Sequence, residues 1–424
     1  MKILHTVESY DPASHGMQQV VKQLSERLSR FGHHVTVATR FDPNRQNLTI
    51  NGVNIEEFKI SGRAVDGYNA EESEIQRYRD FLLNSDFDVI TNFAAQQWAT
   101  DIALPLLKQI KAVKVFVPTG FSELNNIKFK NYFDLMKSWL KDYDMNVFLS
   151  NDYQDVNFAK ENEVKNIKII PNGASAEEFV PDISIDIRKQ LNIPHNHFLI
   201  LHVGSHTGLK GHKEAIEIFK SAKIKNATLL IIGNSTHHGS KINYWAKFLF
   251  KSIANLFYRF SGKRYFPACS ISCSIKGKAD KFSFDRIFNK KFLLVKNLSR
   301  KETVAAYMEA DLFLFPSNIE CSPLVLFECM ASKTPFLTSE VGNAKEIISW
   351  CNSGELLPTV KLENGLKSTD IYKSAEILEK YFYDDKILKE KSESGLNNFV
   401  QNFSWENISK EYEVLYMQLI DKLQ

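Results

Sequence analysis

The alternation of short apolar runs with amphipathic helices is the feature that most limits how this chain can fold. Residues 2–7 form an apolar run typical of a strand, after which apolar residues recur at helical spacing: Met17, Val20, Val21, Leu24, Leu28 and Phe31. Gly32 stands where a left-handed residue would end that helix, and His34 begins the next β-rich run. Strands that alternate with helices predict a parallel sheet covered by helices on both faces.

The alternation runs to about residue 170 and then starts again. Further β-rich runs lie at 88–90, 113–117, 145–149 and 167–170, and a second series follows at 198–203, 229–232, 292–295, 312–315 and 336–338. We therefore predict an α/β protein with two doubly wound, Rossmann-like domains, residues 1–180 and 195–400. A last helical segment, 404–424, is expected to pack back on the first domain. Such sheets bind ligands at the carboxyl ends of their strands, so the site is expected in a central cleft between the domains.

Composition excludes several other classes of protein. The 53 Lys and Arg nearly balance the 50 Asp and Glu, without the basic excess of nucleic-acid-binding proteins. No apolar run approaches the ~20 residues of a membrane span, and the N-terminus lacks the basic start and long apolar core of a secretory signal. The five cysteines are an odd number, which favours reduced thiols in the cytoplasm.

Two groups of possible metal ligands are weak candidates. Cys269 and Cys273 resemble half of a zinc site, but the sequence has no second pair with ligand spacing. His237 and His238 lie in a polar stretch without a nearby carboxylate. We therefore expect no bound metal.

The segment from Pro316 to Glu328 carries the most chemical information. It follows the buried run at 312–315, and Ser322 and Pro323 suit the N-cap and the first position of a helix that would end at about residue 332. Free N–H groups at the start of that helix would suit a diphosphate. Glu320 and Glu328 can accept hydrogen bonds from sugar or ribose hydroxyls. Because Glu328 interrupts an apolar run, a buried carboxylate there needs partners.

This segment resembles the signature of the retaining family-4 glycosyltransferases of the GT-B fold, in which two glutamates separated by seven residues lie in a strand–loop–helix. The resemblance implies that Glu320 lies near the transferred sugar and that Glu328 holds the nucleotide ribose. It also implies that the backbone of four residues contacts the sugar and the phosphates: Ser322, Pro323, Leu324 and Val325. Further stretches agree in order: Gly16, 32–37, 171–173, Gly204 with Lys210 and Gly211, Gly342 with Glu346, and 403–405. The resemblance covers nearly the whole chain apart from about residues 235–290.

The loop at 203–211 ends on a lysine that can neutralise a departing diphosphate. Lys210 would stabilise the charge that grows in the transition state, and Gly204 and Ser205 of the same loop are expected to line the donor site. The family normally has an arginine where this chain has Ser205, and a neutral imidazole at His206 does not replace a guanidinium.

Other positions in the loops also differ from expected patterns. In the first loop, His15-Gly16 replaces a paired glycine, and residues 118–120 read Pro-Thr-Gly where the family often has a histidine. Neither the first loop nor the loop at 203–211 contains G-x-G-x-x-G, which weighs against a dinucleotide oxidoreductase.

These features predict a retaining glycosyltransferase that moves a sugar from a nucleotide diphosphate-sugar to a glycan or a lipid-linked acceptor. The expected role is the biosynthesis of a cell-surface polysaccharide or lipopolysaccharide, with no cofactor besides the donor substrate. The resemblance implies that acceptors bind mainly to the first domain and donors to the second. Two alternatives stay open: a GT-B sugar epimerase or phosphorylase, and a catalytically weak nucleotide-sugar-binding subunit, which the missing arginine suggests.

The stretch between Gly233 and Leu293 is longer than an ordinary connection inside a domain. Within it, residues 242–260 read as a basic amphipathic helix, with cations that include Lys247, Lys251 and Arg259 beside many apolar residues, and Lys263 and Arg264 extend its positive end. We predict that this insertion rests on an anionic membrane, so that a cytoplasmic enzyme is peripheral on the inner face. Packing of the apolar side against the second domain or another subunit is the alternative.

Overall fold

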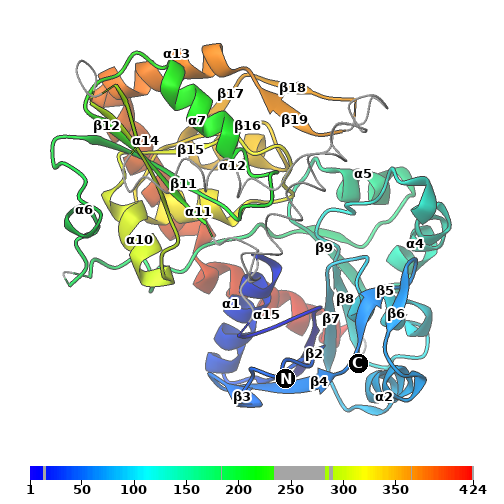
Figure 1. Ribbon diagram of the computed structural model, residues 1–424. Helices are drawn as coiled ribbons and strands as arrows, with labels where there is room; N and C mark the ends of the chain where they lie inside the picture. Colours follow the sequence, from blue (N-terminus) through cyan, green and yellow to red (C-terminus); the bar gives the residue numbers. More distant parts are fainter. Residues whose placement is uncertain (13–15, 183, 234–281, 286–289, 364, 423–424) are drawn as a thin grey trace, which may run out of the picture. The chain divides into compact units, whose positions relative to one another are not determined.

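The computed structural model of the chain describes all residues except 13–15, 183, 234–281, 286–289, 364 and 423–424. The sequence-based predictions for 242–264, for His237 and His238, and for Cys269 and Cys273 therefore lie outside the described residues. The chain divides into two compact units, each built on its own sheet (Figure 1). Unit 1 comprises Met1–Ser175 and Gln401–Gln424, and unit 2 comprises Ala176–Val400.

Unit 1 contains a sheet with the strand order β10-β9-β8-β7-β1-β2-β4-β3. All neighbouring strands are parallel except β3, which runs antiparallel to β4. The strands are β1 (Lys2–Thr6), β2 (His34–Arg40), β3 (Thr49–Ile50), β4 (Val53–Phe58), β7 (Val89–Phe93), β8 (Val113–Val117), β9 (Met145–Phe148) and β10 (Ile167–Ile169). A separate hairpin pairs β5 (Ser61–Arg63) with β6 (Gly67–Asn69).

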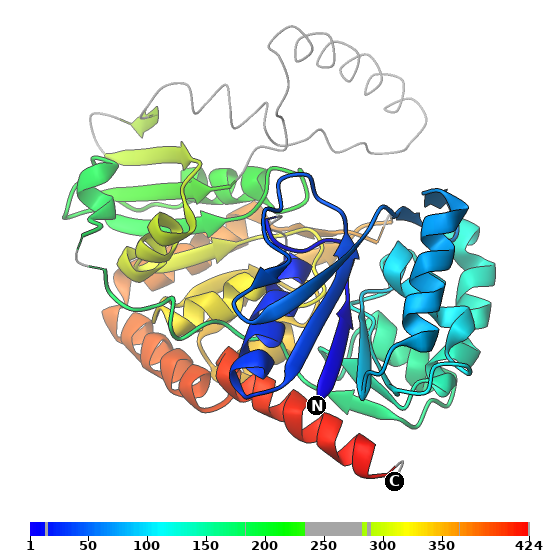
Figure 2. The ribbon, with the colours of Figure 1, turned by 90° about the horizontal axis from the view of Figure 1, so that it is seen from below.

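The helices of unit 1 bury the apolar faces of this sheet. They are α1 (Gly16–Arg30), α2 (Glu72–Asn84), α3 (Trp98–Ala103), α4 (Lys130–Asp142), α5 (Gln154–Glu161) and α15 (Trp405–Asp421), with 3-10 turns at Leu104–Leu106 and Ile127–Phe129. Helix α15 comes from the far end of the sequence and packs beside α1 (Figure 2). Nε2 of His33 lies 2.7 Å from Oε1 of Glu413. The Tyr416 hydroxyl lies 2.7 Å from Oγ1 of Thr91, so α15 is tied to the sheet as well as to α1.

Unit 2 contains a second sheet, with the order β13-β14-β12-β11-β15-β16-β17. It is parallel except at β13, which is antiparallel to β14. The strands are β11 (Phe198–Val203), β12 (Ala227–Ile232), β13 (Phe282–Asp285), β14 (Lys291–Lys296), β15 (Leu312–Phe315), β16 (Phe336–Ser339) and β17 (Gly354–Leu357). A hairpin pairs β18 (Thr359–Lys361) with β19 (Lys367–Thr369).

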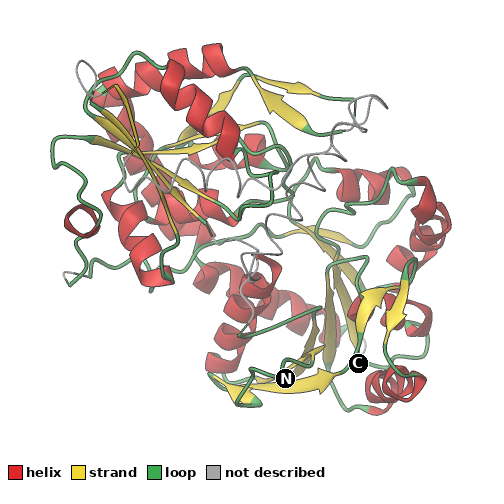
Figure 3. Cartoon of the chain, viewed as in Figure 1, coloured by secondary structure: helices red, strands yellow, loops and turns green. Residues whose placement is uncertain are grey.

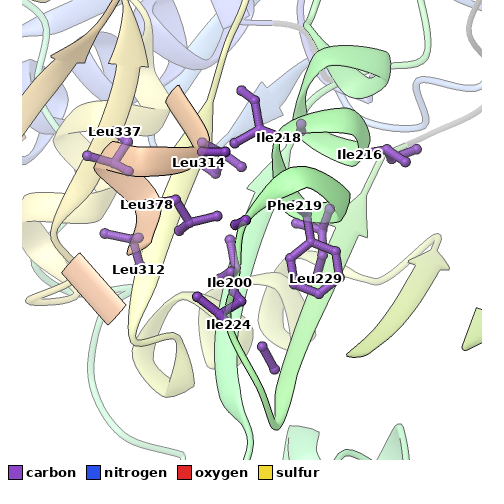
Figure 4. Packing of buried hydrophobic residues seen from close by; sticks show 14 of the residues in the cluster. Ile200, Ile216, Ile218, Phe219, Ile224, Leu229, Leu312, Leu314, Leu337 and Leu378 are labelled. Carbon is purple, nitrogen blue, oxygen red and sulfur yellow. The ribbon is translucent and has the colours of Figure 1, made fainter. Parts of the chain in front are cut away.

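Helices lie on both faces of the unit 2 sheet (Figure 3). They are α6 (Ile187–Gln190), α7 (His212–Ser221), α10 (Arg300–Glu309), α11 (Leu324–Ala331), α12 (Ala344–Cys351), α13 (Ile371–Tyr383) and α14 (Asp385–Asn398), and a π-helical turn at Phe399–Phe403 follows. Because side chains alternate along a strand, Leu312 and Leu314 of β15 join α7 and α13 in one core (Figure 4). Phe313, between them, stacks instead on Tyr307 of α10.

The strand order of unit 2 reverses beside β11. From β11 the chain builds outward through β12 to β14, and it then returns to add β15, β16 and β17 on the other side. The loops that follow β11 and β15 therefore lie next to each other at the carboxyl edge of the sheet. Ligands of open α/β sheets bind at this kind of switch point. In unit 1 the corresponding switch lies between β1 and β7.

Candidate functional site

Lys210 and Glu320 form an ion pair between the loops that follow β11 and β15. Nζ of Lys210 donates to both carboxylate oxygens of Glu320, at 2.7 and 2.9 Å. The hydroxyl of Ser317 donates to Oε1 of the same carboxylate at 2.8 Å. The Glu320 side chain is 10% exposed and that of Lys210 is 29% exposed. The pair is thus partly shielded from water, which strengthens its electrostatic interaction, while the ammonium group keeps an open side for a ligand.

Two glycines let the loops of the site approach closely. Gly211 has φ of +72°, and a Cβ on it would lie 2.0 Å from the carbonyl oxygen of Pro316. Gly342 has φ of +52°, and its Cβ would lie 2.1 Å from the carbonyl oxygen of Cys321. That same oxygen accepts a hydrogen bond from the backbone N–H of Asn343 at 2.9 Å. Only glycine fits at these two positions, and the loop that bears Glu320 is consequently held from two sides.

Helix α11 begins at Leu324, and the predicted cap is wrong. Pro323 occupies the N-cap position and no side chain caps the helix, so Ser322 is one residue too early to be the cap. The Ser322 hydroxyl accepts a hydrogen bond from Nδ2 of Asn343 at 3.2 Å. This contact links the side chain to the loop after β16. The N–H groups of Leu324 and Val325 belong to the first turn of α11, for which the helix supplies no acceptor.

Glu328, inside α11, is bound by an arginine. Nη1 of Arg300 lies 2.7 Å from Oε1 of Glu328, and Nε of Arg300 donates to Glu178 at 2.7 Å. The Glu328 side chain is only 13% exposed. The pKa of the Tyr307 phenol is raised, mainly by burial and then by the charge of Glu328. The expectation that a carboxylate in the apolar face of α11 needs a partner is confirmed.

The remaining predicted residues of unit 2 lie in the loop after β11. The N–H of Gly204 donates to Ile232 at 2.9 Å, and its carbonyl oxygen lies 3.0 Å from Nε2 of His212. A Cβ at Gly204 would lie 3.0 Å from Cβ of Lys210, so this loop folds tightly on itself. Ser205 follows as an exposed residue.

Unit 2 therefore brings most of the predicted site residues into adjacent loops and one helix. Gly204, Ser205 and Lys210 follow β11, while Glu320 and the start of α11 follow β15. Gly16 belongs to unit 1, where it is the first residue of α1.

Sequence reasoning missed Arg300 and Ser317, the partners of the two glutamates. A capping box at Ser299 and Glu302 marks the start of α10 and could have placed Arg300 in its first turn. No sequence pattern predicts that this turn of α10 contacts Glu328 in α11.

The described residues contain neither a metal-binding cluster nor a membrane-spanning helix. None of their groups of three or more His, Cys, Asp and Glu side chains could hold a metal ion. No helix in the same part of the chain is long and apolar enough to cross a membrane.

Comparison with protein families identifies two regions. Residues 14–178 match the family described as Glycosyltransferase Family 4, and residues 278–367 match the family described as glycosyl transferases group 1. The first region lies in unit 1 except for its last three residues, and the second lies in unit 2 and contains Glu320, Glu328 and Arg300. No curated protein matches the sequence.

Solved structures of similar fold cover almost the whole chain. Sucrose-phosphate synthase from Thermosynechococcus elongatus is 20% identical, with a TM-score of 0.70 over 99% of both chains. HepE of Anabaena, solved in complex with UDP, is 14% identical, with a TM-score of 0.69 over 99% of this chain and 100% of that one. WaaG, a glycosyltransferase involved in lipopolysaccharide biosynthesis, is 17% identical, with a TM-score of 0.62 over 97% and 99%. These likenesses confirm the predicted fold of two Rossmann-like domains.

Proposed function

Since the chain is a glycosyltransferase of the GT-B fold, we propose that it is a retaining enzyme that uses a nucleotide diphosphate-sugar as donor. The observation that carries this proposal is the Lys210–Glu320 pair at the switch point of unit 2. The cation can bind the diphosphate of such a donor, and the carboxylate can bind its sugar. The diphosphate needs positive charge, and the sugar hydroxyls need acceptors. A binding site for a neutral ligand would not require a partly buried lysine.

Each residue of the site receives a role in this proposal. The third N–H of Lys210 and the N–H groups of Leu324 and Val325 bind the diphosphate, helped by the positive end of α11. Glu320 accepts a hydrogen bond from the sugar, and Gly204 and Ser205 line the same loop. Glu328 accepts hydrogen bonds from the ribose hydroxyls.

Retention of configuration follows if the acceptor attacks from the side of the leaving group. The bond between the sugar C1 and the diphosphate oxygen breaks, and a bond from C1 to the acceptor oxygen forms on the same face. The acceptor proton passes to the departing diphosphate. Lys210 stabilises the negative charge that collects on that diphosphate, so it acts mainly in the transition state.

A panel of nucleotides tests the donor proposal. We expect at least one of UDP, GDP and ADP to raise the melting temperature, because a ligand that binds only the folded state stabilises it. Uridine nucleotides come first, because similar folds have been solved with UDP and UDP-glucose. Incubation of the matching nucleotide sugars with candidate acceptors should release nucleoside diphosphate and form a glycoside of unchanged anomeric configuration. Isomerisation of the donor without acceptor would instead indicate an epimerase, and binding without any turnover a non-catalytic subunit.

We further propose that the acceptor is a glycan or a lipid-linked sugar, and that the enzyme works at the inner face of the cytoplasmic membrane. This proposal rests on sequence alone, because its basic amphipathic segment, 242–264, lies outside the described residues. Lysine, arginine and aromatic side chains in one such segment are typical of helices that lie on anionic bilayers.

Liposome sedimentation tests the membrane proposal. Binding should require anionic lipid, weaken as salt is added, and fall when Lys247, Lys251 and Arg259 are all replaced by glutamate, because headgroup attraction is screened within a Debye length. The control for net charge replaces three exposed lysines of unit 2, Lys220, Lys380 and Lys389, by glutamate. Equal loss with the control set, or no binding at low salt, would contradict the proposal.

A further inference from the structure

Three buried histidines cluster at the carboxyl end of β11. His202 lies in the strand, His206 in the following loop and His212 at the start of α7, with exposures of 0%, 4% and 1%. The ring of His212 lies between the other two. Its centroid is 4.5 Å from that of His206, in a stacked geometry, and 4.6 Å from that of His202, edge to face. The site described above uses none of these rings.

Carbonyl oxygens determine the tautomers of two of these rings. Nδ1 of His202 lies 2.7 Å from the carbonyl oxygen of Leu314, and Nε2 of His212 lies 3.0 Å from that of Gly204. A carbonyl only accepts, so both nitrogens carry the proton. The opposite nitrogens, Nε2 of His202 and Nδ1 of His212, are buried without a partner and hold the lone pairs.

Both rings are therefore neutral in the folded protein. The pKa of His202 is lowered to about 4 and that of His212 to about 2, mainly by burial and in smaller part by the neighbouring imidazoles and Lys210. A second proton on either ring would place a charge inside the cluster with nothing to balance it.

The outer ring, His206, has a different arrangement of nitrogens. Its Nδ1 is buried without a partner, whereas Nε2 is not among the enclosed, unpartnered atoms. A buried N–H without an acceptor is rare in proteins. The proton of a neutral His206 therefore belongs on Nε2, the nitrogen that is not enclosed. Among the described residues, no acceptor bonds to it.

The surroundings of His206 favour an anion as the missing acceptor. The ring touches the end of β12, because a Cβ on Gly233 would lie 3.3 Å from Cδ2 of His206. The same loop carries Lys210, and the ten-residue helix α7 begins directly after it with Gly211 as N-cap. An imidazole N–H, an ammonium group and the positive end of a helix thus meet at one edge of the sheet. The carboxylate of Glu214, in the first turn of α7, accepts a hydrogen bond from Asn318 at 3.4 Å.

We propose that Nε2–H of His206 binds an oxygen of the donor's β-phosphate, beside Lys210. This inference rests on the proposed function and assigns a further binding residue to it. The stack on His212 fixes the orientation of the imidazole before the ligand arrives. His206 would thereby supply a phosphate contact next to the exposed Ser205.

Titration calorimetry with UDP and UMP tests the assignment, because the two probes differ by one phosphate. His206→Phe keeps a ring for the stack and removes the N–H. It should weaken UDP binding by roughly tenfold to a hundredfold, the effect of losing one hydrogen bond to a charged group, and change UMP binding far less. His206→Gln restores an amide donor near the position of Nε2 and should recover most of the UDP affinity. His197→Phe is the matched control, since His197 is also buried and stacks on Phe292, but at the amino end of β11.

Several outcomes would overturn the proposal. UDP affinity of His206→Phe equal to that of the original protein would exclude the contact, and equal loss for UDP and UMP would indicate a collapsed loop. If His206→Phe does not fold, His206→Met repeats the test with a flexible side chain that donates no hydrogen bond. If the unmodified protein binds none of UDP, GDP and ADP, the proposed function itself is wrong and this inference falls with it. If it binds GDP or ADP instead of UDP, the same variants are compared with that diphosphate and its monophosphate.

Discussion

Lys210→Ala is expected to lower kcat at least about 100-fold, while leaving most of the donor affinity intact. Removal of one preorganised group that stabilises transition-state charge typically has an effect of this size. The loss in kcat should be larger than for replacement of a surface lysine, because Lys210 is partly buried at the switch point of unit 2. Ser205 stands where the resembled family has an arginine, so the lysine carries a larger share of the diphosphate charge. The effect should appear in kcat rather than KM, since the charge grows as the sugar departs.

The same substitution also breaks an ion pair, and the two effects have to be separated. Without Lys210, the Glu320 carboxylate keeps the hydrogen bond from Ser317 but loses its cation at a position that is 10% exposed. A lower melting temperature is therefore expected along with the lower kcat. Lys210→Arg provides a useful comparison, because it keeps the charge and changes the geometry.

Lys220→Ala is the matched control for Lys210→Ala. Lys220 lies near the end of α7, the helix that follows the loop of Lys210, and it pairs with Glu217 on the surface. Its replacement should change neither kcat nor the melting temperature appreciably, because exposed ion pairs contribute little. Full activity of folded Lys210→Ala would remove the lysine from the proposed mechanism. A gain of activity in Ser205→Arg would add support, since it restores the guanidinium of the family pattern.

The strands at the centre of each sheet could be predicted from the sequence. The runs at 113–117, 198–203 and 312–315 coincide with β8, β11 and β15. These strands are covered on both faces and therefore read as mostly apolar stretches, interrupted only by Lys114 in β8 and His202 in β11. The sequence analysis missed β3 to β6, β13 and β17 to β19, which are short strands. Their periodicity is too brief to separate them from loops.

Lys210 and Glu320 could be predicted as members of the candidate site, but neither their contact nor the partners Ser317 and Arg300 could. Lys210 and Glu320 were identified one at a time, from a glycine-bearing loop and from a resemblance. Their pairing depends on the reversal of strand order, which places the ends of β11 and β15 side by side. The histidine cluster could not be predicted either, because it also depends on how the chain folds. His202 interrupts an apolar strand, and only the fold brings His206 and His212 against it.

Glu328→Ala is expected to weaken binding of the nucleotide while leaving the fold intact. Each lost hydrogen bond between the carboxylate and a ribose hydroxyl should cost about 1.5–3 kcal/mol, or roughly 10- to 100-fold in Kd. The fold should survive because Arg300 keeps its second partner, Glu178, at 2.7 Å. Calorimetric Kd values for UDP, with melting temperatures alongside, measure both effects. Glu355→Ala is the control, since Glu355 pairs with Lys380 at 3.0 Å on the surface of unit 2.

A thermodynamic cycle tells a ribose contact from a purely structural role of the Arg300–Glu328 pair. Its four corners are the original protein and Glu328→Ala, each with UDP and with a 2′,3′-dideoxy analogue of UDP. If Glu328 holds the ribose, the original protein loses affinity for the analogue and Glu328→Ala loses little more, so the two changes are not additive. If the carboxylate only anchors Arg300, the substitution weakens both ligands equally and the changes add. Additive changes would therefore reject the ribose assignment even though the variant binds UDP poorly, because the loss would then arise from displacement of the arginine.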